Sequence, residues 1–491
     1  MTTSHLNRIE QLRQMALPLE PDAEQRIHWR EQVIRYTDAF LESLPELPAF
    51  QATEDEGVGI LDSPISETPI PVELALDLLK NHVDRPGGNE GTTPGYLAFI
   101  PSGGLYASAL ADYIAAVTNR FVGIPSCSPG AVRIEPLLLR WMAEFIGYPA
   151  TAAGDFTSGG SLANLTAIVT ARDAHQLKAV DYPKAVVYLS DQTHHSVVKG
   201  LRIAGMKECI VRYVPLDQNY RMQAEALEAV IRSDQQAGFL PWLVVATAGT
   251  TDTGAVDPLA SIADIACQNQ LWMHVDGAYG AMFALCEMGK AILHGIERSD
   301  SLIMDPHKGL FMALGTGAVL VRNKNNLLNA YQHHANYLEG AETASTSGEV
   351  SQADLSPELT RPFRGLRLWL ALKLTGVAPF RAALEEKLLL ARHFYEGLQS
   401  LDGFVTGPPP DLSVVTFRYG PARGDANQFN QKLIQAIQND GRIFLSSTRI
   451  NGEDILRLTV LGFRTHLETI ELALEILQQK AKEIESGTNL A

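Results

Sequence analysis

Two segments, LWMHVDGAYG at residues 271–280 and SLIMDPHKG at residues 301–309, decide how this chain is expected to fold. Each opens with a short apolar run and ends in polar residues. Continuous apolar runs of this length are typical of strands that are buried on both faces of a sheet. Between residues 91 and 375, similar runs such as KAVVYLS, LPWLVVATAG and GAVLVRN alternate with helical stretches. The pattern predicts an α/β domain with a mainly parallel sheet.

The two ends of the chain have a different pattern. Residues 1–90 contain amphipathic helical stretches broken by a Pro/Glu-rich segment, which favours an N-terminal helical arm that packs on a larger unit. Residues 376–491 combine apolar strands such as LSVVTFRYG with a final amphipathic helix, HLETIELALEILQQKAKEIES. We therefore predict three parts: the arm (1–90), a large domain (91–375) and a small C-terminal α+β domain (376–491).

Composition excludes several classes of protein. The 491 residues include 40 Lys and Arg against 56 Asp and Glu, which gives a formal net charge of −16. An acidic chain lacks the basic surface that general nucleic-acid binding requires, and no segment approaches the roughly 18–20 apolar residues of a membrane helix. The start of the chain shows no secretory signal, and the four cysteines form no CxxC motif. We expect a cytoplasmic protein without nucleic-acid or membrane partners.

A carboxylate and an amine follow the two deciding strands. Asp276 ends the first apolar run, and Lys308 follows the second run, 32 residues later. The carboxyl ends of strands are where sites form in α/β sheets. A lysine amine can bond to the aldehyde of pyridoxal 5′-phosphate (PLP), and a carboxylate can keep the pyridine nitrogen of that cofactor protonated. Taken alone, each residue is better explained as a strand-end aspartate or a surface lysine without such a role.

Further segments favour the same cofactor. The Gly/Ser turn of FTSGGSLANL (156–165) runs into a predicted helix, where Gly159, Gly160 and Ser161 could present backbone N–H groups to a phosphate. His194 in SDQTHHS directly follows an apolar run, where an imidazole could stack on a pyridine ring. Thr250 in ATAGTTDTG ends another run, within reach of the ring. A simple helix N-cap and a polar histidine with no site role remain the alternatives. The adjacent histidine pairs lack the spacing of metal ligands, so no metal is expected.

In this order, the Gly/Ser turn, His, Asp and Lys motifs resemble those of the group II PLP-dependent amino-acid decarboxylases. That family includes the aromatic-L-amino-acid, histidine, glutamate and diaminobutyrate decarboxylases. The resemblance runs from about residue 75 to the C-terminus and includes PGYLAFIPSGG, NYLEG and RPFRGLRLW. It implies PLP fold type I, the aspartate-aminotransferase-like α/β architecture, with a helical arm, a large domain on a mixed, mainly parallel seven-stranded sheet, and a small C-terminal domain. It also implies a homodimer with active sites at the subunit interface.

The resemblance also implies roles for individual residues. Lys308 would be the attachment point of PLP, and Asp276 the partner of its pyridine nitrogen. His194 would stack on the ring and assist catalysis, with Ala278 on the other face. The remaining cofactor-binding positions would be Gly160 and Ser161 at the phosphate, Thr250 beside the ring, and His307 and Ser102 near the lysine. Asp305 stands where aromatic decarboxylases often carry Asn, and its role is left open.

Tyr337 in NYLEG precedes a polar segment, rich in Ser, Thr and Gly, whose composition is typical of a loop. In the family, a loop at this place closes over the neighbouring subunit's site, and its tyrosine returns a proton to the substrate carbon. Relatives with Phe at that place tend to form aldehydes oxidatively, so Tyr337 favours amine formation. A tyrosine that caps a helix end remains the alternative.

Phe99, Ile100 and Phe121 are candidates for an apolar substrate pocket, although Arg120 keeps an acidic substrate possible. We therefore expect decarboxylation of an aromatic or bulky apolar L-amino acid to its amine and CO2. Other possibilities are a 2,4-diaminobutyrate-type or acidic amino-acid decarboxylase and a PLP-dependent aldehyde synthase. Outside enzymes, a catalytically silent homologue that acts as a binding subunit is the alternative.

Overall fold

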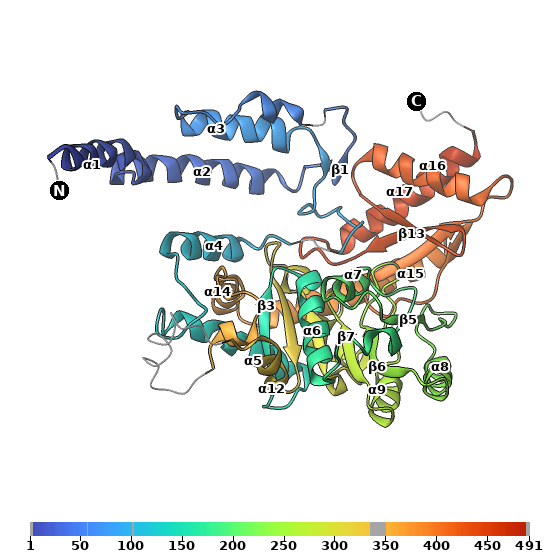
Figure 1. The fold of residues 1–491 in the computed structure, drawn as a ribbon. Coiled ribbons are helices and arrows are strands. Elements are labelled where there is room, and N and C mark those ends of the chain that lie inside the picture. Colours follow the sequence, from blue (N-terminus) through green and yellow to red (C-terminus); the bar gives the residue numbers. More distant parts are fainter. Residues whose placement is uncertain (1–2, 56, 101–102, 334–349, 488–491) are drawn as a thin grey trace.

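The computed structural model describes residues 3–55, 57–100, 103–333 and 350–487, and its centre is a seven-stranded sheet (Figure 1). The strands lie in the order β3, β9, β8, β7, β6, β4, β5. Their bounds are β3 Ala153–Thr157, β4 Ala185–Leu189, β5 Ile210–Tyr213, β6 Leu240–Thr247, β7 Trp272–Asp276, β8 Ser301–Met304 and β9 Gly317–Val321. Strand β9 is antiparallel to both of its neighbours, whereas the pairs among β8, β7, β6, β4 and β5 are parallel. The prediction of a mixed, mainly parallel seven-stranded sheet is confirmed.

Helices cover both faces of this sheet because its strands carry apolar side chains on both sides. One face packs against α6 (Gly160–Ala174), α7 (Ser196–Ile203) and α12 (Lys324–Tyr331). The opposite face packs against α5 (Ile134–Ile146), α8 (Ala224–Gln236) and α9 (Leu259–Gln268). Within β4, Val187 points to the first face and Val186 to the second, as the alternation of side chains along a strand requires. The sheet is therefore a buried layer between two layers of helices.

A second, antiparallel sheet of four strands lies near the C-terminus (Figure 1). Its order is β10, β11, β13, β12, with bounds β10 Phe404–Thr406, β11 Val414–Tyr419, β12 Ser446–Ile450 and β13 Glu453–Thr459. Helices α15 (Ala378–Gln399), α16 (Ala426–Asp440) and α17 (Leu467–Glu485) share a core with it. The preceding helix α14 (Gly365–Thr375) packs on the large core instead. The division of the chain at residues 90 and 375 stays a prediction.

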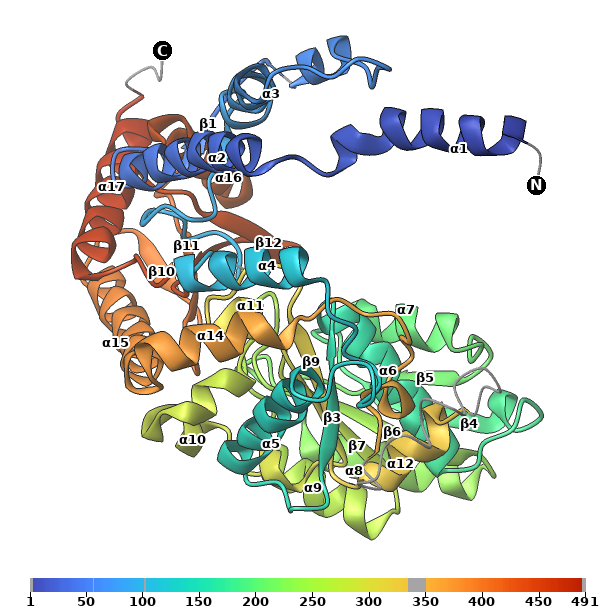
Figure 2. The ribbon, with the colours of Figure 1, turned by 90° about the vertical axis from the view of Figure 1, so that its left-hand side faces the viewer.

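The N-terminal part is helical and extends away from both sheets (Figure 2). It consists of α1 (Thr3–Ala16), α2 (Ala23–Ser43) and α3 (Val72–Leu79), with a short antiparallel pair of β1 (Phe50–Gln51) and β2 (Gly88–Asn89). Three further helices, α4 (Tyr106–Thr118), α10 (Glu287–Ile292) and α11 (Pro306–Gly309), complete the regular elements used below. Within the described residues, none of the helices is both long and apolar enough to cross a membrane.

A buried ionic cluster fixes the chain after residue 350 to the start of the large sheet. The side chain of Arg361 is fully buried and pairs with Asp155 of β3 and, at 2.8 Å, with Glu135 of α5. Its Nη2 also donates to the carbonyl of Phe156 at 2.8 Å, and Glu135 accepts the N–H of Gly365 at 3.0 Å. Burial raises the pKa of both carboxyl groups, and the charge of Arg361 opposes this rise. One guanidinium therefore holds β3, α5 and residues 361–365 together.

We expect Arg361→Met to lower the free energy of unfolding by about 3–5 kcal/mol, because it leaves two carboxyl groups buried without their cation. Chemical denaturation of the full chain measures this change. Arg232→Met is the matched control, since Arg232 pairs only with Glu228 on the exposed face of α8, and it should change stability by about 0.5 kcal/mol or less. Equal effects of the two substitutions would contradict the importance of the buried cluster.

Candidate functional site

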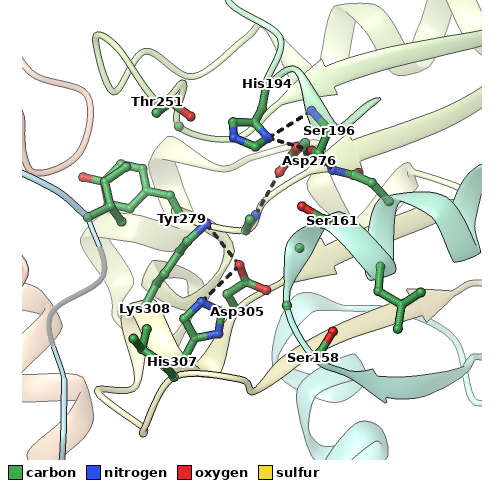
Figure 3. Close-up of a pocket in the computed structure, with 18 of the residues that line it drawn as sticks. Ser158, Ser161, His194, Ser196, Thr251, Asp276, Tyr279, Asp305, His307 and Lys308 are labelled. Carbon is green, nitrogen blue, oxygen red and sulfur yellow. Dashed lines mark hydrogen bonds and ion pairs between the residues drawn. The ribbon is translucent and has the colours of Figure 1, made fainter. Parts of the chain in front are cut away.

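A cavity of about 380 Å³ lies at the carboxyl edge of the large sheet, and five strands deliver residues to it (Figure 3). The contributing segments are 158–162 after β3, 194–196 after β4, 247–251 at the end of β6, 276–279 at the end of β7 and 305–308 after β8. Parallel strands place their carboxyl ends at one edge, which explains why segments far apart in sequence meet here. The cavity brings together seven residues that the sequence analysis named, and their roles stay predictions: Lys308, Asp276, His194, Gly160, Ser161, Ala278 and His307.

Lys308 lies in the single turn of α11, directly after β8. Its Nζ is 3.0 Å from Oδ2 of Asp305, and Nε2 of His307 is 3.7 Å from the same oxygen (Figure 3). Nδ1 of His307 donates to the carbonyl of Thr316 at 2.7 Å, which fixes the orientation of the ring. Asp305 is almost fully buried. Its carboxylate pairs with the amine of Lys308 and so holds this amine at the cavity wall.

The carboxylate of Asp276 ends β7 and is held by two donors. Oδ1 accepts the N–H of Ala278 at 3.2 Å, and Oδ2 accepts the side-chain amide of Asn164 at 3.0 Å. These hydrogen bonds compensate for the loss of water around a buried carboxylate. Asp276 is therefore available as an acceptor at the cavity wall.

His194 lies close to Asp276 in Figure 3, and its Nδ1 is 2.6 Å from Oγ of Ser196. Burial lowers the pKa of His194, with smaller contributions in the same direction from His195 and Lys308, while the charge of Asp276 opposes the shift. The net direction favours a neutral imidazole at pH 7. A neutral imidazole at this place can stack on a flat ligand, and it adds no positive charge to the cavity.

The turn between β3 and α6 has the form of an anion site. The N–H groups of Leu162 and Ala163 bond to the carbonyl of Gly159, so those of Gly160 and Ser161 precede the first hydrogen bonds of α6. A Cβ on Gly160 would lie 3.1 Å from Oδ2 of Asp305, a tight contact that favours glycine. The start of α6 therefore faces the cavity with free donors and little side-chain bulk.

Thr250 does not take the place that its position in the sequence predicts. Its side chain is fully buried, and its hydroxyl pairs with that of Thr253 at 2.7 Å. The chain turns at Gly249, whose φ of +95° redirects the backbone after β6, and the neighbouring Thr251 lines the cavity instead. The turn geometry, and not the strand end, decides which threonine faces the site.

Of the three residues predicted to line the substrate pocket, Ile100 lines the cavity. Phe99 lies outside it and is partly exposed, with its ring edge against Phe444 at a centroid distance of 5.9 Å. Phe121 is partly buried but also lies outside it, within the described chain. Ser102 and Tyr337 fall outside the described residues, so their predicted roles stay predictions.

Asn164 and His274 are cavity-associated residues that sequence reasoning missed. Asn164 of α6 bonds to Asp276, and its Oδ1 is 2.8 Å from Nε2 of His274, which is buried in β7. The available signal was a polar residue within an apolar strand, because buried polar groups require partners. That signal indicates that a partner exists without indicating which residue it is.

The chain is similar to known proteins. Residues 47–420 match the family model described as the pyridoxal-dependent decarboxylase conserved domain. The chain is 37% identical over 407 residues to the aromatic-L-amino-acid decarboxylase of Bacillus atrophaeus, covering 82% of each chain. It is 27% identical to a phenylacetaldehyde synthase of Arabidopsis thaliana, covering 94% of this chain and 96% of the relative. The crystal structure of Oryza sativa TDC with PLP and tryptamine superposes with a TM-score of 0.89 at 26% identity, covering 95% of this chain and 99% of that one.

The pH dependence of stability should report on His274. Burial lowers its pKa to about 4, whereas a histidine of the unfolded chain has a pKa of about 6.5. Between these values the unfolded chain binds a proton that the folded chain does not, so stability falls as the pH decreases from about 6.5 to about 4. We expect His274→Gln to lose stability less steeply across that window, as measured by denaturation at stepped pH. Above pH 7 the two proteins should show equal slopes, and parallel curves throughout would contradict the assignment.

Proposed function

This chain belongs to the pyridoxal-dependent decarboxylase family and is a PLP-dependent amino-acid decarboxylase, and we propose that its substrate is an aromatic L-amino acid, released as the amine and CO2. The observation that carries the proposal is that Lys308, Asp276 and the Gly159–Gly160 turn line one cavity at the carboxyl edge of the sheet. Each matches a different part of PLP: its aldehyde, its pyridine nitrogen and its phosphate.

The donor and acceptor set of the cavity fits PLP. The N–H groups at the start of α6 suit a phosphate. Lys308 supplies an amine within the same cavity, held by Asp305 at 3.0 Å. When bound, PLP supplies an electron sink for the electron pair that the departing carboxylate leaves behind.

The chain's own residues then position the reacting groups. Asp276 would hold a proton at the pyridine nitrogen, with its carboxylate oriented by the hydrogen bonds that its two oxygens accept. His194 would stack its neutral ring on one face of the cofactor ring. Ala278, on the loop after β7, would pack on the opposite face.

The substrate class follows from the lining of the cavity and from the relatives. Ile100, Leu162, Tyr279 and Leu314 provide apolar surface. Among the described residues that line the cavity, none is an arginine that could bind a second carboxylate, and Arg120 is not one of them. The relatives named above are described as acting on aromatic amino acids or as forming an aromatic aldehyde. These observations favour an aromatic substrate over an acidic one.

An aldehyde synthase is the second candidate, because one relative carries that description. The reaction would consume O2 and water and release the aldehyde, CO2, ammonia and hydrogen peroxide from the same amino acid. The two reactions share the cofactor and the first bond broken. Product analysis and oxygen consumption distinguish them.

We also propose that the protein is a cytoplasmic homodimer. Helix α1 exposes an apolar row at a spacing of three residues, consisting of Leu6, Ile9, Leu12 and Met15. The helix lies far from the rest of its own chain in Figure 2, so a second copy is the simplest cover for this row. The four cysteines are unpaired, which suits a reducing compartment.

We expect the PLP-loaded protein to convert L-tryptophan, L-tyrosine or L-phenylalanine to a product lighter by one CO2, identified by mass spectrometry. L-glutamate and L-2,4-diaminobutyrate, offered separately, should remain unchanged. Lys308→Ala is the control, because it removes the amine that bonds to PLP and should abolish turnover. Conversion of glutamate or diaminobutyrate alone would overturn the proposed substrate class.

Tyr337→Phe tests the predicted proton donor. We expect the product to shift from amine towards aldehyde, with oxygen uptake and peroxide formation, because the substrate carbon would lose its source of a proton. Tyr331→Phe is the matched control, since Tyr331 donates to the carbonyl of Thr166 on α6 at 3.0 Å and lies outside the cavity. An unchanged amine yield in Tyr337→Phe would show that another group protonates the product.

A further inference from the structure

A continuous line of buried hydrogen bonds runs from the core of the large sheet to the two residues assigned to the cofactor ring, Asp276 and His194. It passes through side chains of two strands, two helices and one loop, which we call the relay. Its members are Trp272, Ser301, His274 and Asn164, and from Asn164 one branch leads to Asp276 and the other to Ser196 and His194. Every one of these bonds has a direction, and the chemistry of the groups at its ends decides that direction.

The indole end fixes the first half of the relay. The N–H of Trp272 can only donate, and it donates to Oγ of Ser301 at 2.8 Å. Oγ of Ser301 lies 2.8 Å from Nδ1 of His274, and its hydroxyl can donate to that nitrogen. Burial keeps His274 neutral by lowering its pKa to about 4, so the ring carries one proton. With Nδ1 accepting, that proton is on Nε2.

The carboxylate end leads independently to the same result. An ionised carboxylate can only accept, so Asn164 must turn its amide N–H towards Oδ2 of Asp276, at 3.0 Å. Its carbonyl oxygen then faces Nε2 of His274 at 2.8 Å, where only a donor is compatible. The carboxylate end therefore requires a proton on Nε2 of His274, and the indole end is compatible with that form of the neutral ring.

The relay then branches to His194. The second N–H of Asn164 donates to Oγ of Ser196 at 2.9 Å, which leaves the hydroxyl proton of Ser196 for Nδ1 of His194 at 2.6 Å. The backbone N–H of Ser196 points to the same Nδ1 at 3.3 Å. Nδ1 of His194 is thus an acceptor, and the proton of the neutral ring is on Nε2. In Figure 3 that nitrogen faces away from Ser196.

We propose that His274 and Asn164 are positioning residues that set two properties of the site at once: the orientation of the Asp276 carboxylate and the Nε2–H tautomer of His194. In this tautomer His194 offers the cavity a hydrogen-bond donor, which suits an anionic group such as the carboxylate of an amino acid. The inference rests on the proposed function for its use of PLP and substrate, but the tautomer is a property of the chain itself.

The direct test is nitrogen NMR of the full-length PLP-loaded protein with 15N-labelled histidine, in which His194→Gln identifies the signals of His194. We expect an unprotonated Nδ1 and a protonated Nε2. In Asn164→Leu, Ser196 loses the donor that orients its hydroxyl, and the Nε2–H share of His194 should fall, although the backbone N–H of Ser196 still favours an accepting Nδ1. The same variant should weaken PLP binding by about tenfold or more, since Asp276 loses a charge-assisted hydrogen bond.

His274 is tested by a pair of substitutions. His274→Gln retains an N–H that can reach Asn164 and should keep the affinity for PLP close to that of the wild type. His274→Leu removes the donor and should behave like Asn164→Leu. If His274→Leu fails to fold, Asn164→Leu and His274→Gln still test the proposal. Tyr331→Phe removes a different hydrogen bond to α6 and should change neither the tautomer nor the affinity.

A protonated Nδ1 on His194 in the wild type would overturn the proposal. So would an unchanged tautomer and an unchanged PLP affinity in both Asn164→Leu and His274→Leu. Failure of the proposed function is distinguishable from either result. The wild type would then show the expected tautomer and bind PLP, yet release no amine from any aromatic amino acid.

Discussion

The structure depends on the burial of one carboxylate, that of Asp276, at the end of a central strand. An ionised group at such a place is stable only where donors replace water. Here the backbone of Ala278 and the amide of Asn164 provide them. Because Asn164 lies on α6 and Asp276 on β7, their contact also fixes the distance between that helix and the sheet. The start of the same helix forms the proposed phosphate site. The Asn164–Asp276 hydrogen bond therefore links the two ends of the proposed cofactor site.

Much of this could be predicted from the sequence, for physical reasons. Apolar runs without alternation require burial on both faces, which identifies a sheet between helix layers. Parallel strands then place their carboxyl ends at one edge, so Lys308, Asp276 and His194 were expected to meet before any distance was known. Turns were less predictable. The backbone at Gly249 turns with a positive φ, and this selects Thr251 over Thr250 for the cavity.

Long-range partners were beyond the reach of the sequence. A histidine within the apolar run of β7 indicates a buried polar group, but its partners, Ser301 and Asn164, lie 27 and 110 residues away. The partners of Arg361 are similarly distant, on α5 and β3. Phe99 shows the converse limit. Its apolar side chain predicts a place in the cavity, but its ring lies against Phe444 of the C-terminal part. Pairings of this kind depend on how whole elements pack.

Strand β3 has a consequence for the order in which the molecule can be made. It lies at the edge of the sheet, and its neighbour there is β9, which follows it by about 160 residues in the chain. A ribosome therefore releases the Gly/Ser turn long before the strand that holds it in place has been synthesised. During that interval β3 is an unpaired edge open to wrong partners. The proposed phosphate site is therefore completed only after β9 has been synthesised.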